Sequence, residues 1–210
     1  IIKTFCELSD RIGKDKVIWR YDPIILNDMF SLSYHKEQFT RLCSKLGRYT
    51  GQCIISFVDI YSKLRTDILR EISMDEMIEL GKMVSSIAKD FGITVKACCE
   101  KEFLYEYGIK QAYCIDKELI ENICGYSPDL KRDKNQRDSC GCYESIDIGA
   151  YNTCRNGCVY CYANYSSVSV ENNIKRHDPQ GELLIGRVGD NDKITVRNIR
   201  TNKDGQTKLF

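Results

Sequence analysis

Apolar positions recur along the first 125 residues in two periods, one typical of amphipathic helices and the other of short buried strands. Helical spacing predicts helices over Ile1–Ile12, Tyr34–Leu46, Glu71–Phe91, Glu100–Tyr107 and Lys117–Cys124. Runs rich in β-branched and aromatic residues predict strands over Val17–Tyr21, Cys53–Val58, Ile93–Ala97 and Gln111–Ile115. Strands that alternate with helices indicate βα units around a parallel sheet. We therefore predict an α/β fold, a (βα) barrel-like structure or part of a TIM-type barrel.

Local signals place several helix boundaries. Ser73 followed by Glu76 predicts a capping box at the start of the longest helix. Glycine often stands just after the last residue of a helix, because it adopts the backbone conformation that closes the final turn. Gly13, Gly92 and Gly125 each follow a helical pattern in this way, so we expect helices to end before them.

The character of the chain changes after residue 125. We predict two parts, a βα-barrel portion over 1–125 and a cysteine-rich, cluster-binding region with a polar C-terminal wrap over 126–210. Weak strand patterns over Glu182–Val188 and Lys193–Ile199 predict edge strands in that wrap. The chain begins at Ile1, within a helical pattern, so we expect the N-terminal part of the barrel to be missing.

Composition narrows the class of protein. The 210 residues carry a net charge of +1, which gives no global electrostatic argument for a nucleic-acid or membrane partner. Nothing in the sequence resembles a signal peptide, and no apolar run is long enough to span a bilayer, so we expect a cytoplasmic protein. Twelve cysteines in a cytoplasmic chain favour metal binding over disulfides. With only two histidines present, thiolates are the expected ligands.

Polar residues follow the predicted strands, which is where the active sites of βα barrels lie. Arg20 and Asp22 stand at the end of the first strand, and Asp59 follows the second. We predict these three as catalytic residues that contact a substrate or cofactor. The alternative is that the aspartates are caps and turn residues, as Asp often is. Arg20 is not a turn former, so that alternative does not account for it.

Three cysteines form a C-x-x-x-C-x-x-C motif late in the chain, at Cys154, Cys158 and Cys161. A loop with this spacing can place three thiolates on one 4Fe-4S cluster and leave the fourth iron open. Tyr160, just before the last cysteine, would shield the cluster from water. The alternative is a closed structural zinc site completed by a distant fourth cysteine, because C-x-x-C is half of many zinc sites.

A second group of cysteines begins with the C-G-C motif at Cys140 and Cys142. Two thiolates cannot close a metal site, so partners must come from elsewhere. Cys98 or Cys99, together with Cys114, lie at the ends of neighbouring predicted strands and could supply them. We predict a second centre of Cys99, Cys114, Cys140 and Cys142 that holds either a second iron–sulfur cluster or zinc. Four other cysteines lie in apolar patterns and are predicted core residues, Cys6, Cys43, Cys53 and Cys124.

The triad at Cys154, Cys158 and Cys161, with Tyr160 before its last member, resembles the signature of radical S-adenosylmethionine enzymes. That resemblance implies that S-adenosylmethionine binds the open iron and that electron transfer cleaves it to a deoxyadenosyl radical. It further implies an electron donor such as a ferredoxin or flavodoxin. The C-Y-A-N segment is similar to the spore photoproduct lyase group, which makes a nucleic-acid lesion a candidate substrate beside a small molecule.

The longer pattern resembles the bacterial and archaeal family called domain of unknown function 1848. The residues that carry this resemblance are V-I-W-R-Y-D-P-I, I-S-F-V-D, C-I-D, Q-R-D-S-C-G-C and D-I-G-A-Y-N-T-C-R-N-G-C-V-Y-C-Y-A-N. Members have a C-terminal cysteine cluster similar to that of radical S-adenosylmethionine enzymes and no established reaction. In ordinary radical S-adenosylmethionine enzymes the cysteine triad follows the first barrel strand. Here the chain after the triad is too short for the remaining βα units, at about 30 residues or more each, so the barrel is permuted or the cluster serves another purpose.

Two functions from different classes follow from these patterns. The first is a radical S-adenosylmethionine-like enzyme of unknown substrate, in which the cofactor does the chemistry and the protein positions the reactants and excludes water. The second is a non-catalytic metal-binding scaffold or electron-transfer protein, in which both cysteine groups are closed sites of zinc or of an iron–sulfur cluster. Cleavage of S-adenosylmethionine distinguishes the two.

Overall fold

The computed structural model describes residues 1–60, 64, 68–100, 102–137, 139–198 and 201–203. It divides into two compact units. The first comprises Ile1–Glu144 and the segment that begins at Asn202, and the second comprises Ser145–Thr201. Cys140 and Cys142 therefore belong to the first unit, whereas the Cys154, Cys158 and Cys161 triad belongs to the second.

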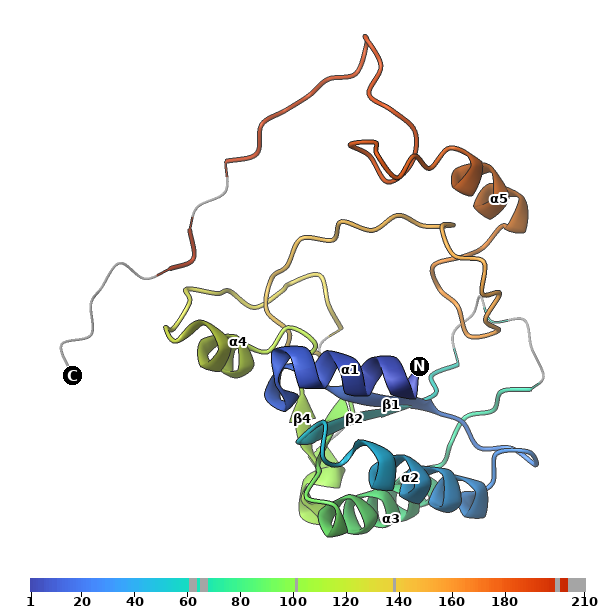
Figure 1. Ribbon diagram of the computed structural model, residues 1–210. Helices are drawn as coiled ribbons and strands as arrows, with labels where there is room; N and C mark the ends of the chain where they lie inside the picture. Colours follow the sequence, from blue (N-terminus) through green and yellow to red (C-terminus); the bar gives the residue numbers. More distant parts are fainter. Residues whose placement is uncertain (61–63, 65–67, 101, 138, 199–200, 204–210) are drawn as a thin grey trace, which may run out of the picture. The chain divides into compact units, whose positions relative to one another are not determined.

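A four-stranded parallel sheet forms the centre of the first unit (Figure 1). The strands lie in the order β1-β2-β3-β4, and they span Trp19–Ile24, Gln52–Phe57, Thr94–Cys98 and Lys110–Ala112. Parallel neighbours bring their carboxyl ends to the same edge. The α/β class and the parallel sheet are confirmed, and four strands would make half of an eight-stranded barrel.

Helices α1 to α4 lie close to their predicted positions. The α-helices are α1 Ile2–Ile12, α2 Leu32–Leu46, α3 Met74–Asp90, α4 Lys117–Cys124 and α5 Ser167–Lys175, and the 3₁₀ helices are η1 Lys14–Lys16 and η2 Glu102–Tyr107. Helices α2 and α3 pack against each other beside the sheet (Figure 1). Gly125 ends α4 in the left-handed conformation, with φ 74°, as the sequence predicts.

An aromatic cluster joins α2 to the first strand. Phe39 is fully buried and stacks on Trp19, with ring centroids 5.0 Å apart, while Tyr21 meets the same ring edge-on at 5.1 Å. His35, one turn earlier on α2, is also buried. Its Nδ1 accepts a hydrogen bond from the Tyr21 hydroxyl at 2.7 Å, and its Nε2 donates one to the carbonyl of Ile25 at 2.8 Å. Both ring nitrogens of His35 are therefore used within the fold.

The predicted capping box opens α3. The Ser73 side chain accepts from the backbone N–H of Glu76, and the Glu76 carboxylate accepts from the backbone N–H of Ser73 at 2.9 Å. Arg70 also forms a bidentate ion pair with Glu76, at 2.7 and 2.9 Å. The Arg70 hydrogen bonds, followed by the Ser73 backbone, lower the pKa of Glu76 from 4.5 to about 2.

We expect Glu76 to stabilise the fold above pH 4.5 and to lose this contribution as the pH falls towards 2, because its folded pKa lies below its unfolded value. Glu76→Gln keeps the cap but loses the charge, so it should lower the free energy of unfolding by about 0.5 kcal/mol at about pH 6. Urea unfolding of both proteins should show this gap shrinking at about pH 3. A gap that does not change with pH would contradict the prediction.

Two predictions about secondary structure are wrong. Segment Glu182–Val188 forms no strand, and neither does Lys193–Ile199 over its described residues 193–198, Ile199 lying outside them. The short helix predicted over Glu100–Tyr107 is present as a 3₁₀ helix over Glu102–Tyr107. Helix α5 was not predicted, because Val168 and Val170 alternate with serines at strand spacing rather than at helical spacing.

The searched helices give no candidate for a transmembrane span: within the described ranges, none combines the length and the apolar character that crossing a bilayer requires.

Candidate functional sites

Five cysteines gather at the carboxyl edge of the sheet in the first unit. Cys98 is the last residue of β3, Cys99 follows it, and Cys114 lies two residues after β4. The loop after α4 returns to this edge and brings Cys140 and Cys142 to it, since the N–H of Tyr143 donates to the carbonyl of Ile115 at 3.2 Å. The ends of two parallel strands and one returning loop therefore place five thiols close together. The outermost two, Cys98 and Cys142, are 44 residues apart in sequence.

The five thiols lie near one another. Cys98 Sγ lies 3.9 Å from Cys99 Sγ and 3.8 Å from Cys114 Sγ. The thiol of Cys140 lies near those of Cys99 and Cys142. The sulfur of Cys142 accepts the backbone N–H of Cys114 at 3.1 Å. We call these five residues the sheet-edge cysteines.

Hydrogen bonding and burial set the thiol pKa values differently within the group. The contact between Cys98 and Cys114 lowers the pKa of Cys98 and, together with burial, raises the pKa of Cys114. Burial raises the pKa of Cys99, and the nearby Cys140 raises it further. Cys98 is therefore the thiol of this pair that loses its proton first.

Two of the predicted catalytic residues lie beside these thiols. Arg20 on β1 donates from Nη2 and Nε to the carboxylate of Asp22, at 2.5 and 3.0 Å, and its remaining nitrogen, Nη1, donates to Cys114 Sγ at 3.4 Å. Although burial favours the neutral form, the hydrogen bonds and charge of Asp22 raise the pKa of Arg20, so the guanidinium stays charged. Asp59, the third, lies beyond β2 and pairs with Arg137.

Glu100 is a site residue that the sequence did not single out. Its carboxylate accepts the backbone N–H of Phe57 at 2.9 Å and so ties the segment after β3 to the end of β2. Burial raises its pKa, against the effect of that hydrogen bond. Its place directly after Cys98 and Cys99 was the only signal available in the sequence.

The C-G-C loop is held by close packing around its glycine. Gly141 is buried, and a Cβ atom there would overlap the ring of Tyr113 and the guanidinium of Arg132. Arg132 donates to the carbonyl of Gly141 at 2.5 Å, and its guanidinium lies over the Tyr113 ring, 5.3 Å from the centroid. Glycine is therefore required between Cys140 and Cys142, because no side chain fits.

The cysteine triad lines one hollow in the second unit. Cys154, Cys158 and Cys161 all face a hollow of about 480 Å³, and Cys154 and Cys158 are exposed. Its other walls come from the loop around the triad and from the start of α5, namely Arg155, Gly157, Asn164, Tyr165, Ser166, Ser167, Val170 and Glu171. The structure thus brings the three triad thiols to one concave surface.

Two asparagines, the buried Asn152 and the half-buried Asn164, hold the triad loop. Asn152 is buried with φ 57°, and its Oδ1 accepts the backbone N–H groups of Tyr165 and Ser166, at 2.9 and 3.2 Å. Asn164 donates to the carbonyl of Cys154, whereas its own Oδ1 is buried and accepts no hydrogen bond from any residue that the structure describes. The sequence analysis missed both, although asparagine is among the residues that most readily adopt positive φ.

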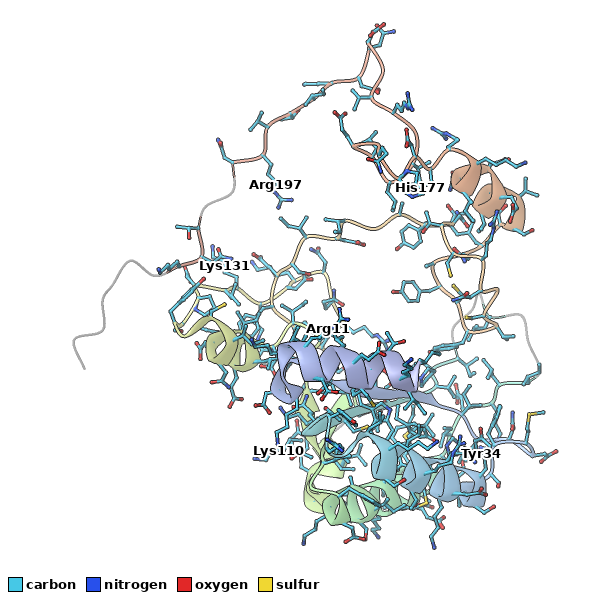
Figure 2. The ribbon with its side chains drawn as sticks, viewed as in Figure 1. Arg11, Tyr34, Lys110, Lys131, His177 and Arg197 are labelled. Carbon is cyan, nitrogen blue, oxygen red and sulfur yellow. The ribbon has the colours of Figure 1, made fainter. Side chains whose placement is uncertain are left out.

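Other predicted residues lie apart from these groups. Tyr160 is half-buried and is not among the residues that line the hollow; Tyr165 is the aromatic residue there. His177 is exposed and donates from Nδ1 to the carbonyl of Leu184 at 2.9 Å (Figure 2). Cys43 and Cys53 are buried as predicted, but Cys124 is exposed on α4, so its assignment to the core is wrong.

In the part of the chain that the structure describes, neither group of cysteines surrounds a single point at which a metal ion could bind. Over the described ranges, no three or more cysteine, histidine or carboxylate side chains are arranged as a bound ion would require. The sheet-edge cysteines meet in pairs through S–H contacts, and the triad cysteines share a wall. Thiols are brought together in both units, one group by strand ends and the other by a single loop.

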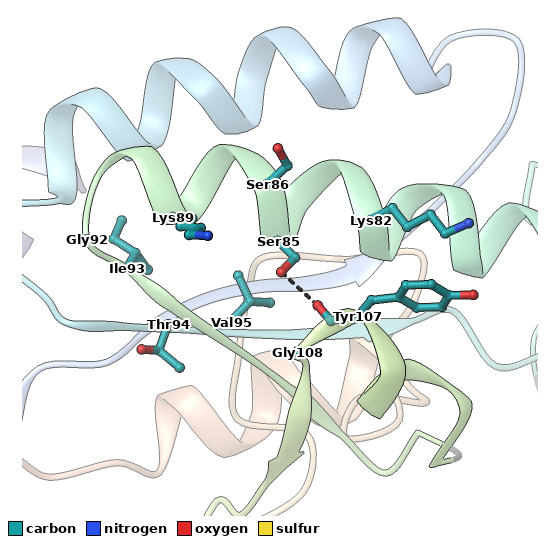
Figure 3. A pocket seen from close by; sticks show the side chains of 10 residues that line it. All are labelled: Lys82, Ser85, Ser86, Lys89, Gly92, Ile93, Thr94, Val95, Tyr107 and Gly108. Carbon is teal, nitrogen blue, oxygen red and sulfur yellow. Dashed lines mark hydrogen bonds between the residues drawn. The ribbon is translucent and has the colours of Figure 1, made fainter.

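A larger hollow, of about 720 Å³, lies at the other end of the sheet (Figure 3). It is lined by Thr94, which begins β3, and by Lys82, Ser85 and Tyr107 among others. Ser85 donates to the carbonyl of Tyr107 at 3.0 Å, and the Lys82 ammonium lies over the Tyr107 ring, 4.7 Å from its centroid. Ser85 and Lys82 thus both interact with Tyr107. The hollow lies at the amino ends of the strands, whereas the sheet-edge cysteines lie at the carboxyl ends.

The fold and its thiols define a class, a cysteine-rich α/β protein built on a parallel sheet. Residues 1–163 match the family described as Domain of unknown function (DUF1848), and the chain therefore belongs to that family. This match confirms the resemblance seen in the sequence. No curated protein and no solved structure shows a significant match to the chain.

Proposed function

We propose that the chain is an iron–sulfur protein of the radical S-adenosylmethionine type, with a 4Fe-4S cluster held by Cys154, Cys158 and Cys161. The observation that carries the proposal is that the three thiols line one hollow of about 480 Å³. Three ligands leave one iron open to a small molecule. The hollow is of the size typical of small-molecule sites, and its mostly apolar wall carries the polar side chains of Arg155, Asn164 and Glu171.

The buried oxygen of Asn164 supports a second occupant beside the cluster. Its Oδ1 has no donor among the residues that the structure describes, and leaving a buried acceptor unsatisfied costs about 1–3 kcal/mol. S-adenosylmethionine carries an amino group and ribose hydroxyls that can donate to such an oxygen. The paired charges of Arg155 and Glu171, at 3.0 and 3.1 Å, lie on the same wall and would hold a polar ligand in place.

When bound, the cluster would supply an electron to S-adenosylmethionine, drawn from a donor such as a ferredoxin or flavodoxin. The protein's own task is to position the ligands and to keep water out. We propose further that the parallel sheet is part of a βα barrel. The charges of Arg20, Asp22 and Asp59 at its carboxyl edge would then contact the substrate, a small molecule or a nucleic-acid lesion.

The test uses the whole chain, purified and reconstituted without oxygen. Iron, sulfide and zinc are measured, and the electron paramagnetic resonance spectrum of the reduced protein is recorded with and without S-adenosylmethionine. We expect a four-iron signal that changes when S-adenosylmethionine is added, because the open iron gains a ligand. A signal that S-adenosylmethionine leaves unchanged, or zinc in place of iron at the triad, would overturn the proposal and favour a metal-stabilised scaffold.

A further inference from the structure

Two pairs of sulfurs among the sheet-edge cysteines have the separation of neighbouring ligands on a single metal ion. Zinc binds four thiolates in a tetrahedron with Zn–S distances of about 2.3 Å, which places neighbouring sulfurs about 3.8 Å apart. Cys98 Sγ lies 3.8 Å from Cys114 Sγ and 3.9 Å from Cys99 Sγ. In a four-iron cluster each thiolate binds a different corner of the cube, so its sulfurs stand farther apart. These two distances therefore favour a mononuclear ion over a cluster.

A strained backbone brings the second of these thiols into the group. Cys99 has φ 58°, a conformation uncommon for residues other than glycine and asparagine. Successive side chains of an extended strand point to opposite faces, yet the sulfurs of Cys98 and Cys99 meet because the chain leaves strand geometry at Cys99. Strain of this kind is concentrated at functional sites, where surrounding structure holds it.

Hydrogen bonds to sulfur also fit a site for thiolates. The backbone N–H of Cys114 donates to Cys142 Sγ at 3.1 Å, and Arg20 donates to Cys114 Sγ at 3.4 Å. Such donors stabilise negative charge on metal-bound sulfur. Arg20 also offsets part of the charge that four thiolates around one divalent ion would leave in excess. Its pairing with Asp22 holds the guanidinium in this position.

We propose that four of the five sheet-edge cysteines bind one zinc ion in a closed tetrahedral site, separate from the triad. The ion would replace the S–H contacts between the thiols by sulfur–zinc bonds and release their protons. Tetrahedral coordination by four sulfurs selects zinc among the common divalent ions. The site would link the ends of β3 and β4 to the loop of Cys140 and Cys142.

The test removes the triad first, so that any remaining metal is not bound there. The whole chain with Cys154, Cys158 and Cys161 all replaced by serine is purified, and its zinc and iron are measured. We expect about one zinc per chain. X-ray absorption at the zinc edge should show four sulfur neighbours at about 2.3 Å, and cobalt exchanged into the site should give the visible bands of a tetrahedral tetrathiolate.

Adding Cys140→Ser and Cys142→Ser to this protein should abolish stoichiometric zinc, whereas adding Cys124→Ser, which changes an exposed cysteine on α4, should leave it unchanged. The absorption and cobalt spectra need no further substitution, so they decide the question even if the C-G-C variant fails to fold. Absence of zinc, fewer than four sulfur neighbours, or an iron–sulfur cluster in its place would each overturn the proposal. Because the triad is absent here, failure leaves the proposed function untouched.

Discussion

Replacing Cys158 by serine is expected to abolish the four-iron signal of the reduced, reconstituted protein. Cys158 is the middle cysteine of the motif and lines the hollow with Cys154 and Cys161, so its loss would leave two thiolates for the proposed cluster, which needs at least three. Losing even a group that only supports a ligand lowers metal affinity about 10–100-fold, so the loss of a ligand should reduce cluster iron by more than about tenfold. Iron and sulfide analysis and electron paramagnetic resonance measure it.

Cys124→Ser is the matched control for this substitution. Cys124 is equally an exposed cysteine, but it lies on α4 in the first unit. Its replacement should leave the cluster signal and the iron content as in the unmodified chain. If Cys158→Ser retained a full four-iron signal, the triad would not be the cluster site.

Replacing Phe39 by alanine is expected to destabilise the first unit by about 3–5 kcal/mol, the range for a large buried aromatic residue. Phe39 is fully buried and fills the space between α2 and the rings of Trp19 and Tyr21. The chain has one tryptophan, Trp19, and it stacks on Phe39, so tryptophan fluorescence during urea unfolding reports directly on this region.

Two further substitutions serve as controls for this measurement. Phe39→Leu keeps much of the buried volume and should cost only about 1–1.5 kcal/mol. Glu37→Ala, at an exposed position of the same helix, should change the free energy of unfolding by about 0.5 kcal/mol or less. A loss below about 1 kcal/mol for Phe39→Ala would show that the cluster around Trp19 does not limit the stability of the unit.

The elements of the first unit could be predicted because each carries its own local signal. Helix α3 has a capping box at Ser73 and Glu76, and α4 ends before a glycine, so their bounds followed from hydrogen-bonding chemistry. Strands β2 and β3 are apolar runs between helices. In the second unit such signals are weak: serines and asparagines occupy four of the nine positions of α5, and these residues compete with helical hydrogen bonds.

The grouping of cysteines at the sheet edge was only partly accessible from sequence. Parallel strands predict that the residues after β3 and β4 lie at the same edge, which brought Cys114 together with a neighbour. The sequence left open whether that neighbour was Cys98 or Cys99. Both contribute, because the positive φ of Cys99 turns its side chain towards that of Cys98. A backbone conformation of this kind in a residue other than glycine leaves no trace in a hydrophobic pattern.

The strand order β1-β2-β3-β4 has a consequence for biosynthesis. Each strand pairs with the one made just before it, so the sheet can grow at a single edge while the ribosome is still translating, and no early strand has to wait for a distant partner. The thiols are the exception. Cys98, Cys99 and Cys114 are made before Cys140 and Cys142, so the nascent chain carries three of its five sheet-edge thiols without their partners until the C-G-C loop emerges.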